Sequence, residues 1–187
     1  MHAKGMAVNR MNKIKKLAFA GAASVLLLGG LAGAVFASTN SSFQSRGTGT
    51  EASLSLSGCQ FTSAGCIVES TGTGTTSHMG PDTYVSTLTV HWALATSNKS
   101  GGFCAPADGP TVITAANGDN DTVTLQNVGI VCEVGATALH APHTFNGLFT
   151  ISGGTGDFAG ATGSGTVTGG DNGYDISYYT ASGTIAY

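Results

Sequence analysis

Thr83 to Leu94 reads TYVSTLTVHWAL, and apolar residues recur in it at every second position. A period of two is typical of a β-strand with one buried face, because successive side chains of a strand point to opposite faces of the sheet. The stretch therefore predicts a half-buried strand, with His91 on the polar face. The apolar series consists of Tyr84, Leu88, Val90, Trp92 and Leu94, interrupted at Ser86.

Three later segments repeat this alternation between turns rich in Gly, Asn and Asp. Each puts three apolar residues on one face: Val123, Leu125 and Val131 in 121–134, Phe145, Phe149 and Ile151 in 143–151, and Tyr174, Ile176 and Tyr178 in 174–187. We find no helical apolar period after residue 37 and expect an all-β fold of about eight short antiparallel strands, a sandwich or a barrel. Glycines inside strands let a sheet bend and close, which favours a small closed barrel.

The first 37 residues have the features of a secretory signal peptide in the expected order. Basic residues between Arg10 and Lys16 precede an apolar run over 17–36, and Val35 and Ala37 stand at the −3 and −1 positions of a small-residue cleavage site. An uncleaved membrane helix is the alternative, since a span needs roughly 20 apolar residues. The Gly and Ala content of the run favours cleavage after Ala37 and a secreted, extracellular protein.

Cleavage changes the sign of the charge. Five of the seven Lys and Arg residues lie before residue 17, whereas all ten Asp and Glu residues lie after it. The exported part keeps Arg46 and Lys99 alone as basic residues, too few for the cationic patches that nucleic acids and anionic membrane surfaces require. We expect no nucleic-acid partner and no stable membrane insertion after cleavage. Translation could start at Met1, Met6 or Met11.

All four cysteines lie in the exported part, and an even number in an oxidising compartment predicts disulfide bonds. Of the three pairings that four cysteines allow, the pairing of near neighbours needs the least loop closure. This favours Cys59–Cys66 and Cys104–Cys132. A zinc site is the alternative, but the chain has no C-x-x-C pair.

Composition divides the exported part in two. Residues 38–51 (STNSSFQSRGTGTE) are small and polar and predict a flexible leader. From Ala52 the chain is rich in β-branched and aromatic residues, so 52–187 predicts one disulfide-tied barrel domain.

The segment from Gly153 to Gly163 (GGTGDFAGATG) is the most distinctive motif. Its glycines allow positive φ angles in a turn, and Phe158 can fold back as an apolar plug. A nucleotide-binding loop does not fit, because the glycine spacing differs and no helical pattern follows. A turn between two strands is the interpretation that fits. Its residues are Gly153, Gly154, Gly156, Phe158, Gly160 and Gly163.

Extended to GGTGDFAGATGSG, this segment resembles the late part of the allene oxide cyclase and dirigent superfamily, and most of all secreted bacterial proteins with an allene oxide cyclase-like β-barrel domain. STGTGTTSHMG (70–80) and TAANGD (114–119) resemble the same group. The resemblance implies an eight-stranded barrel over 52–187, a lumen able to hold a small apolar molecule, and a homo-trimer. It carries over no catalytic residue, because dirigent proteins have an arginine in place of Thr162 and no carboxylate of the plant enzymes has a counterpart here.

Histidine is the side chain best suited to acid–base chemistry near neutral pH. His91 is a catalytic candidate if its strand face lines the lumen, although the opposite, apolar face is the one expected to fill it. His78 follows a Gly-Thr run, where a turn or packing role competes with catalysis. His140 and His143 could reach one metal ion, but two imidazoles without a local carboxylate or thiolate fit a surface loop better. We expect no metal and no cofactor.

Other polar side chains have ordinary interpretations. Carboxylates at strand ends are expected in solvent, and the tyrosines near the end of the chain either fill the core or line a pocket mouth. The residues concerned are Glu69, Asp82, Glu133, Tyr174, Tyr178 and Tyr179.

Three functions stay open at this point. The first is a secreted, non-catalytic barrel that holds a small apolar ligand or acts at the cell envelope. The second is a cofactor-free cyclase or isomerase acting on a reactive apolar substrate, and the third is a structural envelope or matrix protein. A cavity of several hundred Å³ containing a polar residue such as His91 or a glutamate would favour chemistry. A lumen packed solid with Trp92, Phe145 and Phe149 would exclude both ligand and catalysis.

Overall fold

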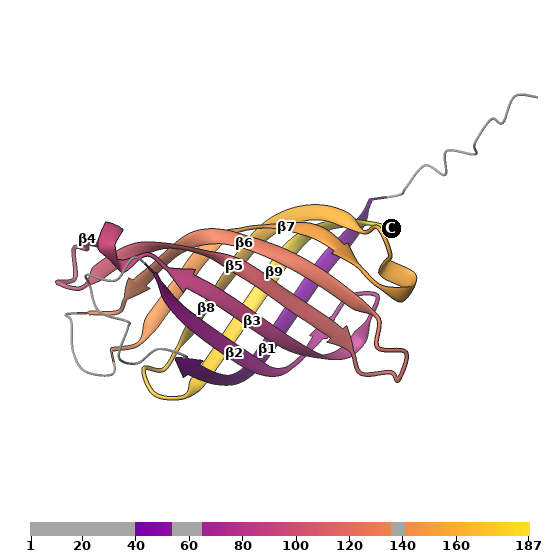
Figure 1. The fold of residues 1–187 in the computed structure, drawn as a ribbon, viewed down its shortest axis with the longest axis horizontal. Coiled ribbons are helices and arrows are strands. Elements are labelled where there is room, and N and C mark those ends of the chain that lie inside the picture. Colours follow the sequence, from indigo (N-terminus) through magenta and orange to yellow (C-terminus); the bar gives the residue numbers. More distant parts are fainter. Residues whose placement is uncertain (1–39, 54–64, 136–140) are drawn as a thin grey trace, which may run out of the picture. The chain divides into compact units, whose positions relative to one another are not determined.

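The computed structural model describes residues 40–53, 65–135 and 141–187 (Figure 1). The predicted signal peptide lies outside these residues. The strands are β1 (Ser41–Ser53), β2 (Cys66–Thr76), β3 (Gly80–Val90), β4 (Thr96–Ser97), β5 (Phe103–Ala115), β6 (Thr122–Glu133), β7 (His143–Gly154), β8 (Thr162–Asp171) and β9 (Ile176–Ala186), and two short 3-10 helices are η1 (Trp92–Leu94) and η2 (Gly156–Phe158). In the described part, no helix has the length and apolar character needed to cross a membrane.

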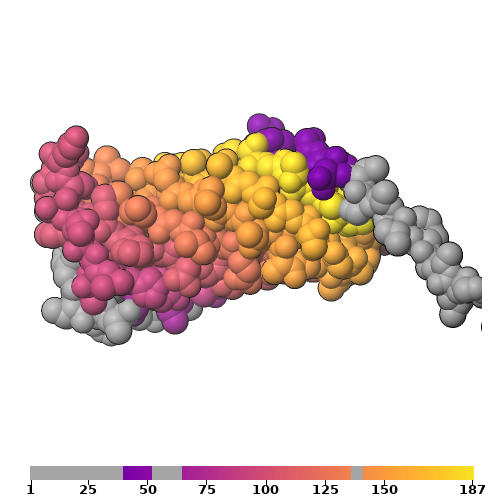
Figure 2. Space-filling model, turned by 90° about the horizontal axis from the view of Figure 1, so that it is seen from above, coloured from indigo at the N-terminus to yellow at the C-terminus, as the bar shows by residue number. Residues whose placement is uncertain are grey.

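The strands form one antiparallel sheet that closes on itself. Neighbours follow the order β3-β2-β1-β9-β8-β7-β6-β5, and β3 pairs with β5 to complete the ring. The two-residue strand β4 pairs with the start of β5 outside the ring. The space-filling view shows the outer side of the wall as a continuous surface (Figure 2). The predicted fold, a small all-β barrel of about eight antiparallel strands, is confirmed.

The flexible leader expected over 38–51 is wrong. Ser41–Ser53 is β1, which pairs with β2 on one side and with β9 on the other. Its inward positions alternate with exposed ones, but they are occupied by Phe43, Ser45 and Gly47, of which two are small. A Cβ added at Gly47 would lie 2.6 Å from Cε1 of Tyr179 and 2.7 Å from Cε1 of Tyr84. The strand looks like a linker in sequence because large rings from β3 and β9 occupy the space in front of it.

The largest fully buried side chains lie mainly at one end of the barrel. Phe43 and Phe149 are fully buried with ring centroids 5.5 Å apart, and aliphatic side chains from the other strands surround them. The turn motif lies at this end, where Gly153, Gly156 and Gly160 have positive φ angles of 140°, 60° and 78°. The aliphatic members of the packed end are Ile113, Val123, Ile151 and Ile185.

Phe158, at the end of η2, is buried in the core, and its ring lies 4.8 Å from that of Tyr187. The remaining glycines of the motif, Gly154 and Gly163, belong to β7 and β8. The predicted turn between two strands, with Phe158 as an apolar plug, is therefore confirmed.

Two details of the predicted strands differ. β3 ends at Val90 instead of continuing to Leu94, which is 64% exposed, and Trp92 is buried within η1. In β9 the odd positions point inward, where Ser177, Ala181 and Ile185 are buried and Tyr179 is half-buried, whereas Ile176, Tyr178 and the preceding Tyr174 are exposed. Alternation predicts that the two opposite faces of a strand differ. Where both faces carry apolar residues, as in β9, it does not reveal which face points inward.

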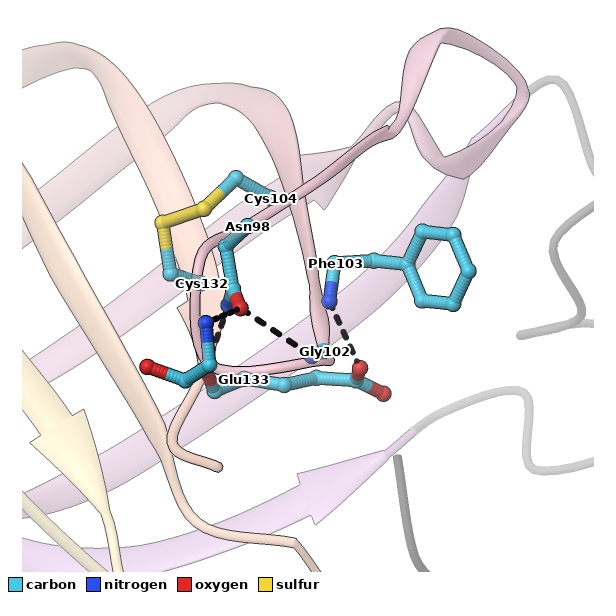
Figure 3. Close-up of a disulfide and its surroundings, with 7 residues drawn as sticks. Asn98, Gly102, Phe103, Cys104, Cys132 and Glu133 are labelled. Atoms are coloured by element: carbon cyan, nitrogen blue, oxygen red, sulfur yellow. Dashed lines mark hydrogen bonds between the residues drawn. A yellow bond between two sulfur atoms is a disulfide. The ribbon is translucent and has the colours of Figure 1, made fainter. Parts of the chain in front are cut away.

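A disulfide joins Cys104 on β5 to Cys132 on β6, where the two residues are direct cross-strand partners. Hydrogen bonds of Asn98 and Glu133 fix the segment just before Cys104, next to the disulfide (Figure 3). The Asn98 side chain donates to the Glu133 carbonyl at 3.0 Å and accepts from the Gly102 amide at 3.0 Å. The predicted Cys104–Cys132 pairing is confirmed. The predicted Cys59–Cys66 pairing includes Cys59, which lies outside the described residues.

Removing this disulfide tests its contribution to stability. The cysteines are 28 residues apart in sequence, and a loop of about that length gives about 3.6 kcal/mol from chain entropy. Cys104→Ala/Cys132→Ala should therefore lower the free energy of unfolding in urea by about 2–4 kcal/mol. Ser97→Ala, on an exposed neighbouring position, should change it by less than about 0.5 kcal/mol. A double variant as stable as the wild type would contradict this role.

Candidate functional site

The end of the barrel away from the packed core contains a cavity of about 660 Å³. This volume lies in the range of small-molecule sites. Its rim includes the exposed Tyr174, and its wall is mainly apolar. The apolar and aromatic wall residues include Val68, Tyr84, Leu88, Val90, Trp92, Leu125, Val131, Phe145, Val167 and Tyr179.

Two tyrosines separate the cavity from the packed end. The rings of Tyr84 and Tyr179 meet edge to face with centroids 4.8 Å apart. The Tyr179 hydroxyl hydrogen-bonds the Ser45 hydroxyl at 2.8 Å, and Thr76 in turn donates to Ser45 at 2.7 Å. Burial raises the pKa of Tyr179, so both its ring and its hydroxyl are held in the neutral state. The floor of the cavity is therefore rigid and uncharged.

One side of the wall holds a buried chain of hydrogen bonds across three neighbouring strands. The Asn127 amide donates to Thr111 Oγ1 at 2.9 Å and to the Gly109 carbonyl at 3.2 Å, and Thr111 donates to Ser86 at 2.9 Å. Asn127 is only 4% exposed, and its Oδ1 has no hydrogen-bond partner in the described structure. A buried acceptor without a donor is costly, so this oxygen is a point where a donor would stabilise the wall.

The mouth of the cavity is charged. His143 Nδ1 lies 3.0 Å from Asp171 Oδ2, and the other carboxylate oxygen accepts from the Gly173 amide at 2.6 Å. The hydrogen bond to Asp171 raises the pKa of His143, and the charges of Asp171, Glu51 and Glu133 raise it further against the effect of burial. Asp171 therefore fixes the imidazole ring and stabilises its protonated form.

Glu51, at the end of β1, also belongs to the wall. Burial raises the pKa of its carboxyl to about 7, and the charge of Asp171 adds to the rise while His143 opposes it. Among the described residues we find no hydrogen bond or ion pair to this carboxylate. The cavity thus contains a carboxyl that changes its charge near neutral pH, and an imidazole whose protonated form is stabilised by Asp171.

The two histidines predicted as catalytic candidates lie outside the cavity. His91 points to the outer side, where Nε2 is 2.7 Å from Asp108 Oδ1. His78 occupies the turn between β2 and β3 with a φ of 69°, and Nε2 lies 3.0 Å from the Ser42 carbonyl oxygen. The solvent-facing interpretation of His91 and the turn interpretation of His78 agree with these positions.

The other predicted positions are distributed differently. His143 is in the cavity wall and not in a surface loop, whereas His140 lies outside the described residues. Within the described ranges, no three His, Cys, Asp or Glu side chains are grouped as a metal site would require. Glu133, expected in solvent, is buried and accepts from the Phe103 amide at 2.9 Å. Asp82 is buried too, and burial raises its pKa.

Sequence reasoning missed three residues of the site: Glu51, Asn127 and Asp171. Glu51 stood in the segment expected to be a leader, and Asp171 in a turn signal. A weak signal was present for Glu51, since it continues the odd-numbered series Phe43, Ser45, Gly47 that faces inward. The site depends on strands far apart in sequence, because Glu51 lies on β1, Asn127 on β6 and Asp171 on β8.

No family model, curated protein or solved structure matches this chain. The likeness of the glycine-rich strings to the allene oxide cyclase-like group therefore stays a prediction. The evidence for the barrel is the order in which the strands pair in the structure.

The raised pKa of Glu51 makes stability depend on pH in a specific direction. A carboxyl whose pKa rises from 4.5 to about 7 on folding stabilises the fold below pH 4.5, and this contribution is lost as the pH rises through about 7. Glu51→Gln should therefore stabilise the protein relative to wild type at pH 8 but not at pH 4.5. We expect a difference on the order of 1 kcal/mol, because water in the cavity screens the charge.

Urea unfolding at the two pH values measures this difference. Glu69→Gln is the matched control, because Glu69 is outside the cavity wall. Equal behaviour of the two variants would show that Glu51 is not desolvated in the fold.

Proposed function

We propose that this protein binds one small apolar molecule in the lumen of its barrel. The observation that supports this most directly is the cavity of about 660 Å³ with a mainly apolar and aromatic wall. A pocket of this kind, with a few polar groups at fixed places, is typical of small-molecule sites. The packed end and the tyrosine floor close the lumen at one side, so a ligand would enter and leave at the mouth.

The sequence adds two supports. A signal peptide over residues 1–37 and paired cysteines favour a secreted protein, which would meet its ligand outside the cell. The glycine-rich strings resemble barrels whose lumen holds apolar molecules. A structural envelope or matrix role has no comparable support, because a lumen of this size stabilises nothing by itself.

A lumen-filling substitution tests the proposal. Leu88→Trp, on the cavity wall, should weaken the binding of N-phenyl-1-naphthylamine, a neutral fluorescent probe of apolar sites, by tenfold or more. Thr83→Trp is the matched control, since this residue is exposed on the opposite face of the same strand. The fluorescence titration should give one probe per wild-type chain. Failure of the wild type to bind the probe would contradict the proposal and favour the structural role.

The charged mouth favours a second candidate, a cofactor-free isomerase or cyclase. His143, oriented by Asp171, is an acid, and Glu51 is a base once it is ionised, so the two could move a proton on a bound substrate. The cavity also meets the criterion set from sequence, since it has several hundred Å³ and contains glutamates. The fold alone identifies no catalytic residue, so this candidate function depends on His143 and Glu51.

Proton transfer can be tested with 5-nitro-1,2-benzisoxazole. A base takes the proton from the ring carbon, the N–O bond breaks, and the single product is a nitrophenolate that carries a nitrile group and is followed by its absorbance. The rate should increase as the pH rises through about 7, where Glu51 ionises, and Glu51→Gln should lower it at least tenfold at pH 8. Equal rates for the variant and the wild type would contradict a catalytic role for Glu51.

A further inference from the structure

We propose that the lumen selects apolar amines, with the protonated nitrogen at Glu51 and the apolar body against the aromatic wall. This proposal rests on the proposed function, because it names the class of molecule that the same cavity would bind. The observation behind it is that some polar groups of the cavity wall have hydrogen-bond partners among the described residues and others do not.

The carboxylates of the cavity are not equivalent. Asp171 accepts from His143 and from the Gly173 amide, and Glu133 accepts from the Phe103 amide. Among the described residues the Glu51 carboxylate has neither a hydrogen bond nor an ion pair, although it is half-buried. A desolvated carboxylate without a partner is the group that gains most from a cation, because burial strengthens the attraction between opposite charges.

Asn127 is an independent indication on another strand. Its amide nitrogen is used twice within the wall, which leaves Oδ1 as an acceptor without a donor although the residue is 4% exposed. Its orientation follows from the Gly109 carbonyl, which can only accept a hydrogen bond. Both unpartnered groups are therefore acceptors, and a ligand that fits them must bring hydrogen-bond donors.

This pattern discriminates among ligand classes. Among the described wall residues, an anionic ligand would meet Glu51, Asp171 and Glu133 with His143 alone to attract it, and His143 is already engaged by Asp171. A neutral alcohol could supply a donor but no charge. An alkyl amine supplies both, and it remains protonated below about pH 10, as lysine does.

The test compares three molecules with the same apolar chain: octylamine, 1-octanol and octanoate. Each displaces N-phenyl-1-naphthylamine from the purified protein at pH 8, and the displacement gives its affinity. Octylamine should bind at least tenfold more tightly than 1-octanol, and octanoate more weakly than either. Glu51→Gln should reduce the preference for octylamine over 1-octanol to less than threefold. Glu69→Gln, which alters a glutamate outside the cavity, should keep it.

The preference should also depend on pH. The charged groups that share the wall with Glu51 are Asp171 on β8, His143 on β7 and Glu133 on β6. Because Glu51 accepts a proton as the pH falls through about 7, the preference for octylamine should decline between pH 8 and pH 5 in the wild type. The same measurement on Glu51→Gln separates this contribution from those of the other three groups, and the variant should show a flatter profile.

The outcomes separate this inference from the proposed function. If the probe binds but octylamine and 1-octanol compete equally, or octanoate competes best, the amine proposal is overturned and the apolar-ligand function stands. A preference for octylamine that persists in Glu51→Gln also overturns it, because another carboxylate would then hold the amine. If the probe does not bind at all, the proposed function itself fails.

Discussion

The pairing of β3 with β5 is the constraint on which the rest of the structure depends. It turns a row of antiparallel strands into a ring, so that every strand of the ring has a hydrogen-bonded neighbour on both sides. A closed ring has an inside, and the inside of an eight-stranded barrel is just wide enough for side chains to fill or for one small ligand. Whether this interior is solid or hollow is decided by the size of the inward residues at each level.

Side-chain size divides the interior into two parts. At the packed end, Phe43, Phe149 and Phe158 belong to one buried cluster with branched aliphatic residues. Toward the mouth, the inward positions include Ser70, Ser86 and Gly169, which are too small to meet across the barrel. Tyr84 and Tyr179 lie between the two parts, and their position depends on the missing side chain of Gly47. A single glycine on β1 thus sets where the packed core ends and the cavity begins.

This division explains what could be predicted from the sequence. Alternation and turn residues predicted the all-β barrel, the motif turn with Phe158 and the Cys104–Cys132 disulfide, because each depends on neighbours in sequence or on a local pattern. β1 was missed because its inward residues were selected to accommodate rings from β3 and β9, a relation that no local pattern contains. Glu51, Asn127 and Asp171 were missed for the same reason, since the ring of strands, and not the sequence, brings them to one cavity.

The polar residues of the cavity lower the stability of the fold, whereas the packed end of the barrel raises it. An ionised Glu51 inside the barrel and an Asn127 oxygen without a donor among the described residues each oppose folding. A barrel that served only as a scaffold would be more stable with apolar residues at these positions and a filled interior. The disulfide and the hydrogen bonds of Asn98 and Glu133 strengthen the same end of the barrel that the cavity weakens. A binding site needs polar groups that lower the stability of the fold, and therefore needs stabilising bonds around them. The presence of both at this end of the barrel is the strongest physical argument that the lumen has a function.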